Sequence, residues 1–350
     1  MQGFRHLSYV CSMKSRWVIH VTFLLVIVVA AACNNGANTT GNEQGLFAKD
    51  PLLKTLTDKI KKDSTNAGLY YERGIALHRM AQDTLALQDL KKAVSLDSSH
   101  AEYYSAIGDM LFEHKDISGS IQWLQKAIAL NKDDPRAHLK IAKLFLYAKD
   151  YPKAFSEINT VLRQDIYNPE AYFLKGMIYK DLKDTSKAIS SFQTAINVSP
   201  QYKDAFVQLG IMYSAKKDPV ALKYYDNAFK LDTLDVSPLY DKGMYYQDLG
   251  NYEQAKAEYK NCIMHNSQYA DAYFNTGWIL MQQDSLEKAW RQYDIVTQTD
   301  PNNANAYYNR GLCSEMMGKK DDAIRDYKQV LVFNPKYTEA TEALKRLGAK

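Results

Sequence analysis

The sequence LYYERG at residues 69–74 returns near the far end of the chain as AYYNRG at residues 306–311. The glycines that close these two stretches, Gly74 and Gly311, are separated by one residue less than seven periods of 34. Self-similarity at a fixed period of this length is the mark of a repeat architecture, in which each copy is one supersecondary unit. The chain is therefore expected to be a repeat protein from which one residue has been lost.

The period of 34 holds in eight copies. Each copy has a small residue at one position, and these residues are Gly74, Gly108, Ala142, Gly176, Gly210, Gly243, Gly277 and Gly311. A second small residue follows, at Ala86, Ser120, Ala154, Ala188, Ala221, Ala255, Ala289 and Ala323. A large apolar residue comes next, at Leu90, Leu124, Ile158, Phe192, Tyr225, Tyr259, Tyr293 and Tyr327. The missing residue falls between Gly210 and Ala221, in the turn around KKDP at 216–219.

This pattern, with Pro200, Pro301 and Pro335 closing three copies, resembles the tetratricopeptide repeat (TPR), whose signature is W-x2-L-G-x2-Y…A-x3-F…P. The resemblance implies an all-α fold, a solenoid of about eight helix–turn–helix repeats over residues 67–337 that winds into a right-handed superhelix. Small residues are expected where the two helices of a repeat approach closely. In the last repeat, Gly318 can supply a left-handed stop to the first helix.

Each end of a solenoid needs a cover, because one helix pair leaves an apolar face exposed. Residues 50–66 are predicted to form an N-terminal capping helix, with Leu52, Leu53, Leu56 and Ile60 at helical spacing. Residues 338–350 are predicted to form the C-terminal capping helix.

The N-terminal residues have the features of a targeting segment. Residues 17–32, WVIHVTFLLVIVVAAA, are apolar, follow Lys14 and Arg16, and are slightly short for a membrane span. They predict a secretory signal peptide over residues 1–32. The segment MKSR at 13–16 is already a complete positively charged start, so initiation at Met13 is a hypothesis.

The small residues before Cys33 resemble the bacterial lipoprotein box, although Ala30 stands where Leu is usual. The resemblance implies cleavage after Ala32 and lipidation of Cys33; the alternative is ordinary cleavage, with Cys33 incidental. Residues 33–49 are predicted to be the lipidated cysteine and a flexible tether, because residues 34–46 hold almost no apolar side chains. By analogy with sorting rules in enteric bacteria, Asn34 favours the outer membrane over the inner.

The composition and the motifs of the chain argue against enzymatic activity and against a nucleic-acid partner. The formal net charge of +4 falls close to zero once Arg5, Lys14 and Arg16 are set aside, so no nucleic-acid partner is expected. Neither GxxxxGK[ST] nor HExxH occurs, and the histidines lack metal-ligand spacing. Cys262 and Cys313 are expected to be buried thiols. The sequence predicts no cofactor, no metal site and no enzymatic activity.

The family resemblance implies that the first helix of each repeat lines a concave surface. Positions three before and one after the glycine then share one helix face. In repeats 4 to 8 all ten of these residues are apolar: Phe173, Met177, Val207, Ile211, Tyr240, Met244, Phe274, Trp278, Tyr308 and Leu312. They predict a peptide-binding groove, and the alternative is that they pack between neighbouring helices. No repeat has the Asn at the later position that family members use to clamp a terminal carboxylate.

Nearer the N-terminus the concave positions are charged, at Glu102, Asp109, Arg136 and Lys143. Together these features predict a membrane-anchored scaffold of a bacterial cell envelope, which binds peptide or helix segments of other envelope proteins. Two alternatives stay open: a structural component that self-assembles into homo-oligomers, and a factor that associates with cell-wall glycan.

Overall fold

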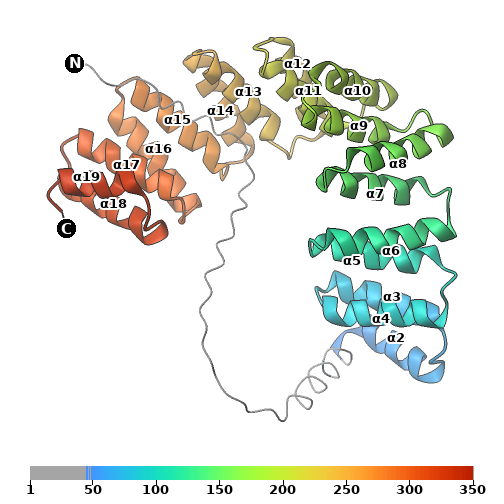
Figure 1. Ribbon diagram of the computed structural model, residues 1–350. Helices are drawn as coiled ribbons and strands as arrows, with labels where there is room; N and C mark the ends of the chain where they lie inside the picture. Colours follow the sequence, from blue (N-terminus) through green and yellow to red (C-terminus); the bar gives the residue numbers. More distant parts are fainter. Residues whose placement is uncertain (1–44, 46, 48, 350) are drawn as a thin grey trace.

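A computed structural model describes residues 45, 47 and 49–349 of the chain. The predicted signal peptide, Cys33 and most of the predicted tether lie outside the described residues. Within them the chain forms eighteen α-helices, labelled α2 to α19 in Figure 1, and no strand. The prediction of an all-α fold is confirmed.

The helices form eight antiparallel pairs, and each pair is one repeat. The first helices of the pairs are α3 (Ala67–Arg79), α5 (Ala101–Glu113), α7 (Pro135–Tyr147), α9 (Pro169–Asp181), α11 (Lys203–Ser214), α13 (Ser237–Asp248), α15 (Ala270–Gln282) and α17 (Ala304–Met316). The second helices are α4 (Asp83–Leu96), α6 (Ile117–Leu130), α8 (Tyr151–Gln164), α10 (Thr185–Val198), α12 (Val220–Leu231), α14 (Tyr252–His265), α16 (Leu286–Thr299) and α18 (Lys320–Phe333). Helix α2 (Pro51–Lys62) precedes the first pair, and α19 (Thr338–Arg346) follows the last.

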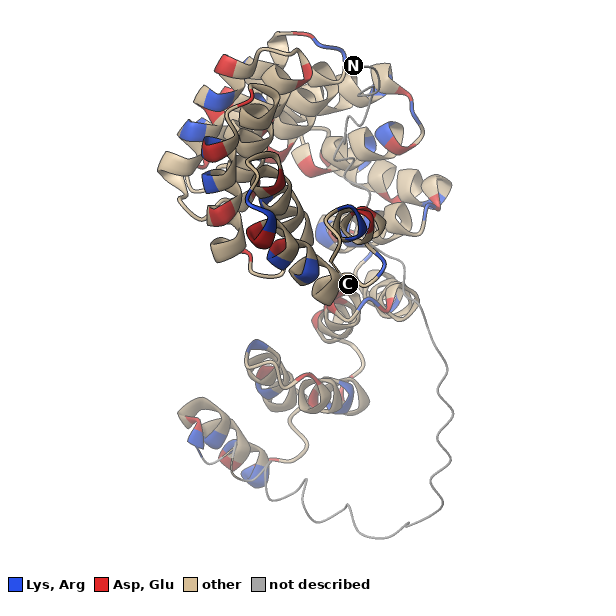
Figure 2. Cartoon of the chain, turned by 90° about the vertical axis from the view of Figure 1, so that its left-hand side faces the viewer, with Lys and Arg blue, Asp and Glu red and all other residues tan. Residues whose placement is uncertain are grey.

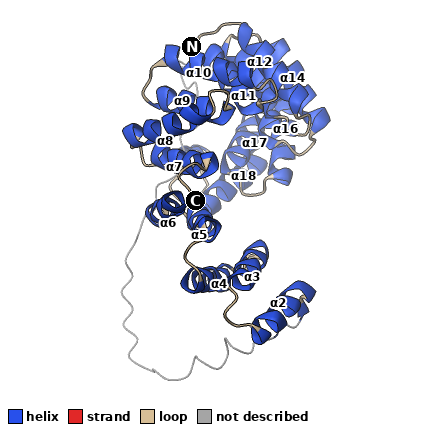
Figure 3. Cartoon of the chain, turned by 90° about the vertical axis from the view of Figure 1, so that its right-hand side faces the viewer, coloured by secondary structure: helices blue, strands red, loops and turns tan. Residues whose placement is uncertain are grey.

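The pairs stack into a curved solenoid. Every helix packs against the next one along the chain. Successive first helices also approach one another, at α3–α5, α7–α9 and α11–α13, and no two second helices of the described part pack as closely. In Figure 1, α5, α7, α9 and α11 accordingly lie on the inner side of the arc, with α6, α8, α10 and α12 outside them. Figure 3 shows the repeats from α7 onward curling round, while α2–α4 extend away from them. The first helices therefore line the concave side.

Close contact between the two helices of a pair explains the repeated glycine. A methyl group on Gly176 would lie 2.5 Å from the ring of Phe192, closer than side chains can approach. In repeat 1 a methyl group on Gly74 would lie 2.9 Å from Leu90. The large residue predicted for the second helix meets the glycine in each of the seven repeats that have one, which confirms the predicted register.

Two repeats depart from this pattern, and each departure is accommodated. Ser120 replaces the second small residue in repeat 2, and its buried hydroxyl donates a hydrogen bond to the Gly108 carbonyl at 2.7 Å. Ala142 replaces the glycine in repeat 3. It is buried in the same cluster as Ile158, an aliphatic side chain rather than a ring.

Every turn between the paired helices has one residue in the left-handed region. These residues lie seven positions after the repeat's first small residue, with φ between 54° and 76°: Ala81, Lys115, Lys149, Lys183, Lys217, Gly250, Asp284 and Gly318. The left-handed stop predicted at Gly318 is confirmed. Because Lys217 keeps the regular spacing from Gly210 and Ala221 comes one residue early, the deletion lies within residues 218–220, where α12 begins.

Both ends of the stack are covered by a helix. Leu53, Leu56 and Ile60 of α2 are buried, whereas Leu52 is 53% exposed. At the other end α19 buries Ala340, Ala343 and Leu344.

The predicted tether ends earlier than residue 49. Gly45, Phe47 and Lys49 are helical, and Phe47 packs against the first hydrophobic cluster. The guanidinium of Arg73 lies 5.0 Å from the centre of the Phe47 ring. The cation–π contact with Arg73 and the apolar contacts both favour this position of the Phe47 side chain.

Candidate functional site

The ten apolar residues predicted to line a groove lie on α9, α11, α13, α15 and α17, and we call this set the apolar ladder. On each helix two of them stand four residues apart, one turn from each other on the same face. All ten are partly buried. The helices that carry them are first helices of their repeats, and that the ten side chains line a peptide-binding groove stays a prediction.

The aromatic members of the ladder are held by neighbouring rings. Tyr240 lies 5.7 Å from Tyr259 of its own second helix and 5.4 Å from Tyr269, just before the next first helix. The same three-ring arrangement recurs for Phe173 with Phe192 and Tyr202, and for Tyr308 with Tyr327 and Tyr337. Packing thus accounts for one side of these rings, and it fixes their orientation.

We call the two ladder residues of one helix a rung. Asn275 of α15 contacts the rung of α13, and the sequence analysis did not single it out. Its Nδ2 donates to the Tyr240 hydroxyl at 2.9 Å and lies 3.0 Å from the Met244 sulfur. One turn further along α15, Trp278 packs edge-on against Tyr252, with ring centres 5.9 Å apart. The sequence did carry a signal for Asn275: a polar residue stands two positions before the glycine, directly after an aromatic residue of the ladder.

Carboxylates accompany the ladder. They are Glu170, Asp181, Asp204, Asp241, Asp248 and Asp271, and all lie on its first helices. Within residues 49–349 none of the six makes an ion pair or accepts a side-chain hydrogen bond; five are exposed, and Asp241 is partly buried. Burial raises the pKa of Asp241 to about 6, with a smaller contribution from the charge of Asp235. Figure 2 shows acidic and basic segments interspersed over the visible face as a whole.

On the corresponding face of the N-terminal repeats, several charged residues form ion pairs. Lys140 of α7 and Asp109 of α5 form an ion pair of 2.6 Å between neighbouring repeats. Glu102 bonds to His100 at 2.8 Å, and Arg136 lies 3.6 Å from Asp134. Three of the four charged concave positions of this region, Glu102, Asp109 and Arg136, thus have a partner of opposite charge or a histidine within the chain.

Three basic residues one position before the glycine join the second helix of their own repeat to the helix that precedes the repeat, a feature that sequence reasoning missed. Arg310 bonds to Asp326 of its own repeat at 2.6 Å and to Asp294 of the preceding repeat at 2.7 Å. Equivalent contacts join Lys242 to Asp226 and Glu258, and Arg73 to Asp89 and Thr57. The partners lie sixteen residues before and after the basic residue, and that spacing of opposite charges was the available signal.

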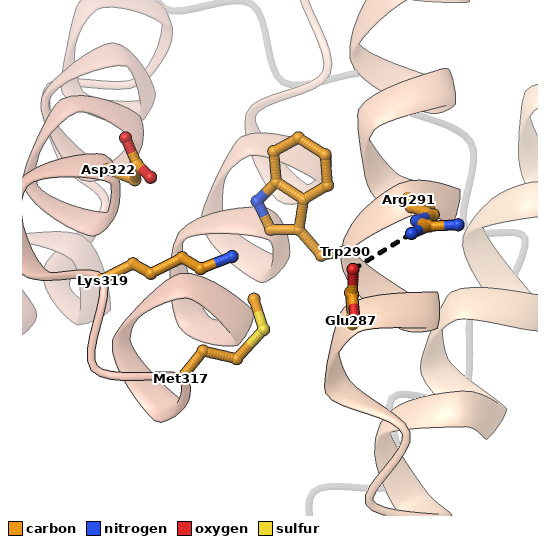
Figure 4. A pocket seen from close by; sticks show the side chains of 6 residues that line it. All are labelled: Glu287, Trp290, Arg291, Met317, Lys319 and Asp322. Atoms are coloured by element: carbon orange, nitrogen blue, oxygen red, sulfur yellow. Dashed lines mark hydrogen bonds and ion pairs between the residues drawn. The ribbon is translucent and has the colours of Figure 1, made fainter.

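A shallow pocket of about 250 Å³ lies between α16 and the start of α18. In Figure 4, Trp290 stands between Lys319 and Met317 on one side and the ion pair of Glu287 with Arg291 on the other. Small-molecule sites usually measure about 300–1,000 Å³ and are mostly apolar. This pocket is therefore too small and too exposed to indicate a cofactor.

The two cysteines of the described residues are shielded from solvent. Cys262 and Cys313 are fully buried free thiols, as predicted, and burial raises the pKa of each to about 12. No cluster of His, Cys, Asp or Glu among the described residues could hold a metal ion. None of the described helices combines the length and the apolar composition of a membrane span.

The fold and the ladder define a helical-repeat protein with a lined concave face. Family models described as tetratricopeptide repeat match residues 67–100, 169–202, 240–294 and 304–337, and one described as TPR repeat matches residues 108–148. The chain is therefore a tetratricopeptide repeat protein, and the family resemblance of its repeats is confirmed.

Individual relatives are distant. Human tetratricopeptide repeat protein 6 is 23% identical in an alignment of 156 residues, and the match covers 34% of this chain and 30% of that protein. The match thus spans less than a third of the relative's length. A tetratricopeptide repeat protein from Parabacteroides merdae has a TM-score of 0.49 at 15% identity, over 71% of this chain and 98% of that one. The C-terminal part of a TPR repeat-containing protein from Cytophaga hutchinsonii also scores 0.49, at 19% identity, over 66% and 97%.

Proposed function

We propose that this protein is a non-catalytic scaffold whose concave face, in repeats 4 to 8, binds a peptide or helix segment of another envelope protein. The observation that carries the proposal is the apolar ladder: five successive first helices each present two apolar side chains one turn apart, none of them fully buried. Aromatic and methionine side chains in such numbers are typical of adaptable protein-binding surfaces. The ring-on-ring packing holds the ladder in place before a partner arrives, which lowers the entropy lost on binding.

We further propose that the protein is held in the cell envelope by lipid on Cys33. The support is the sequence: an apolar run that ends in Ala30-Ala31-Ala32, a cysteine, and a polar segment behind it. Several acyl chains, at roughly 0.8 kcal/mol per buried methylene, would hold the protein on a membrane. The outer membrane is the proposed location, because Asn34 rather than Asp follows the cysteine.

The binding proposal is tested with Trp278→Ala. Because aromatic anchors dominate protein interfaces, this change should weaken capture of the protein's partners from solubilised native membranes by about thirtyfold, roughly 2 kcal/mol, while the repeats stay folded. Trp123→Ala is the matched control, since Trp123 of the second helix α6 is also partly buried and packs 5.7 Å from Tyr104. The control should lower the melting temperature and leave partner capture unchanged.

The opposite pattern would reject the proposal. If Trp278→Ala lowers only the melting temperature, as the control does, the ladder is packing and the partner binds elsewhere.

The anchoring proposal is tested with Cys33→Ser. The variant should leave the membrane fraction and lose palmitate labelling. Full membrane retention together with an unlabelled parent protein would contradict lipidation.

A further inference from the structure

Acidic residues stand before or after the two ladder residues on four of the five helices. On α9 the residues Glu170, Phe173, Met177 and Asp181 follow at spacings of three, four and four, which places all four on one helix face. The other helices keep parts of the same order. Asp204 precedes the rung on α11, Asp271 precedes the rung on α15, and Asp248 follows the rung on α13. Two apolar side chains per helix thus form a stripe bordered by carboxylates.

In repeats 4 to 8 no basic residue stands three positions before the first or four positions after the second ladder residue of a helix. The positions that flank each rung hold either an acidic residue or a neutral one. The basic side chains of the same first helices have other partners or occupy other positions. Lys203 pairs with Asp232 and Asp235, and Lys180 donates to Gln208 at 2.7 Å. Lys175, Lys242 and Arg310 occupy the position one before the glycine, where Lys242 and Arg310 clamp second helices.

Within the described residues these carboxylates form no ion pair, although the charges of Lys217 and Lys180 act on Asp248 and Asp181. Asp241 illustrates the consequence: it follows the ladder residue Tyr240, it is partly buried, and burial raises its pKa. A desolvated carboxylate without a partner destabilises the folded protein. Lys140 holds the equivalent position in repeat 3 and has Asp109 as its partner at 2.6 Å. The C-terminal repeats therefore lack a compensation that the N-terminal repeats have.

We propose that the occupant of the ladder is a cationic amphipathic helix of another protein, with its apolar stripe on the rungs and its Lys and Arg side chains on the bordering carboxylates. This inference rests on the proposed binding function and names the chemistry of the partner. Rungs of two residues make the ladder about one helical turn wide, close to the apolar stripe of an amphipathic helix. Complementary charge then selects the partner and fixes its register.

Three synthetic peptides test the inference against the full chain. They share one apolar stripe of Leu and Phe and differ only in the polar face, which is all Lys, all Gln or all Glu. At low salt the Lys peptide should bind about tenfold more tightly than the Gln peptide, and the Glu peptide should bind most weakly. The advantage of the Lys peptide should shrink at about 0.5 M salt, because screening weakens exposed charge pairs.

A pair of double variants assigns the effect to the ladder. Asp204→Asn with Asp271→Asn should weaken the Lys peptide about fivefold and leave the Gln peptide unchanged. The control is Asp321→Asn with Glu339→Gln, which removes the same net charge and also changes first-turn acids, on α18 and α19. It should leave both peptides unchanged.

The outcomes separate this inference from the function it rests on. If all three peptides bind with equal affinity and Trp278→Ala abolishes binding, the ladder binds helices but the charge inference is overturned. Tighter binding of the Glu peptide, or equal weakening by both double variants, also overturns it. If no peptide binds in a manner that depends on Trp278, both the inference and the proposed function fail.

Discussion

The three N-terminal repeats, α3–α8, and the five C-terminal repeats, α9–α18, share one backbone design but fill it differently. In the N-terminal repeats the second helix places an aliphatic residue against the close contact, at Leu90, Leu124 and Ile158. The C-terminal repeats place rings there, at Phe192, Tyr225, Tyr259, Tyr293 and Tyr327. The concave face changes with them, from charged residues of both signs, among which Lys140 pairs with Asp109, to an apolar ladder whose six carboxylates form no ion pair within the described residues.

This difference separates what the fold needs from what it leaves free. Both regions stack equally regular helix pairs, so neither the rings nor the apolar ladder is required for a repeat to form. On the N-terminal face Lys140 forms an ion pair with Asp109. On the C-terminal face the six carboxylates beside the apolar ladder form no ion pair within the described residues.

The largest expected effect compares one glycine from each region. Gly210→Ala should lower the free energy of unfolding by about 2 kcal/mol, because the new methyl group would lie 2.5 Å from the Tyr225 ring and overpacking outweighs the gain in helix propensity. Gly74→Ala should lower it by about 1 kcal/mol, because the new methyl group would lie 2.9 Å from the buried Leu90, a milder overlap that the gain in helix propensity partly offsets. Urea denaturation followed by circular dichroism measures both.

Equal effects of the two changes would break the comparison, since rings and aliphatic side chains would then fill the contact in the same way.

The next effect concerns the unpaired carboxylate. Burial raises the pKa of Asp241 from 3.8 to about 6. A carboxyl group with a raised pKa in the folded state favours folding below about pH 4, and this contribution is lost as pH rises from about 4 to 6. Asp241→Asn should therefore stabilise the protein by about 1.5 kcal/mol at pH 7 and leave stability unchanged near pH 3.5.

Stability measured at both pH values checks this sign. Lys140→Gln, at the equivalent position in repeat 3, should instead be mildly destabilising at pH 7, because it removes the pair with Asp109. A stabilising effect of the Lys140 change would contradict the distinction between the two faces.

The smallest effect lies inside the ring-filled region. The Tyr327 hydroxyl donates to Glu315 at 2.7 Å, whereas the buried Tyr293 hydroxyl has no partner within the described residues. The residue of repeat 7 at the position of Glu315 is Met281, which offers no oxygen acceptor. Tyr327→Phe should lower the free energy of unfolding by about 1 kcal/mol, and Tyr293→Phe should be neutral or stabilising.

Thermal unfolding of the two variants, side by side, makes this measurement. A loss of stability on Tyr293→Phe equal to that on Tyr327→Phe would mean that both hydroxyls are hydrogen-bonded in solution.

The sequence predicted the register well because the close helix contact admits few residue types. Gly243 and Ala255 recur at fixed spacing since larger side chains do not fit, and a sterically forced pattern survives in a single sequence. Other features escaped prediction because many residue types satisfy them. Lys149 and Asp284 adopt left-handed turns without glycine, since neighbouring hydrogen bonds hold the turn.

The candidate site was only partly predictable for a related reason. Tyr240 shares its position with residues that pack between helices, so its identity alone does not separate binding from packing. The clamps at Lys242 and Arg310 depend on charges from three helices, which become neighbours only after the repeats stack. Phe47 was assigned to the tether because the preceding residues 34–46 are mostly polar, yet its ring packs under the guanidinium of Arg73, a contact between residues far apart in the sequence.

Site-directed photocrosslinking in native membranes tests the central claim most directly. A photoreactive phenylalanine analogue is placed at position 278 on the ladder and, as the matched control, at position 260, where Lys260 is exposed on the second helix α14. The account predicts discrete crosslinked partner bands from position 278 and none from position 260. Bands from position 260 with none from position 278 would contradict the claim that the apolar ladder is the binding surface.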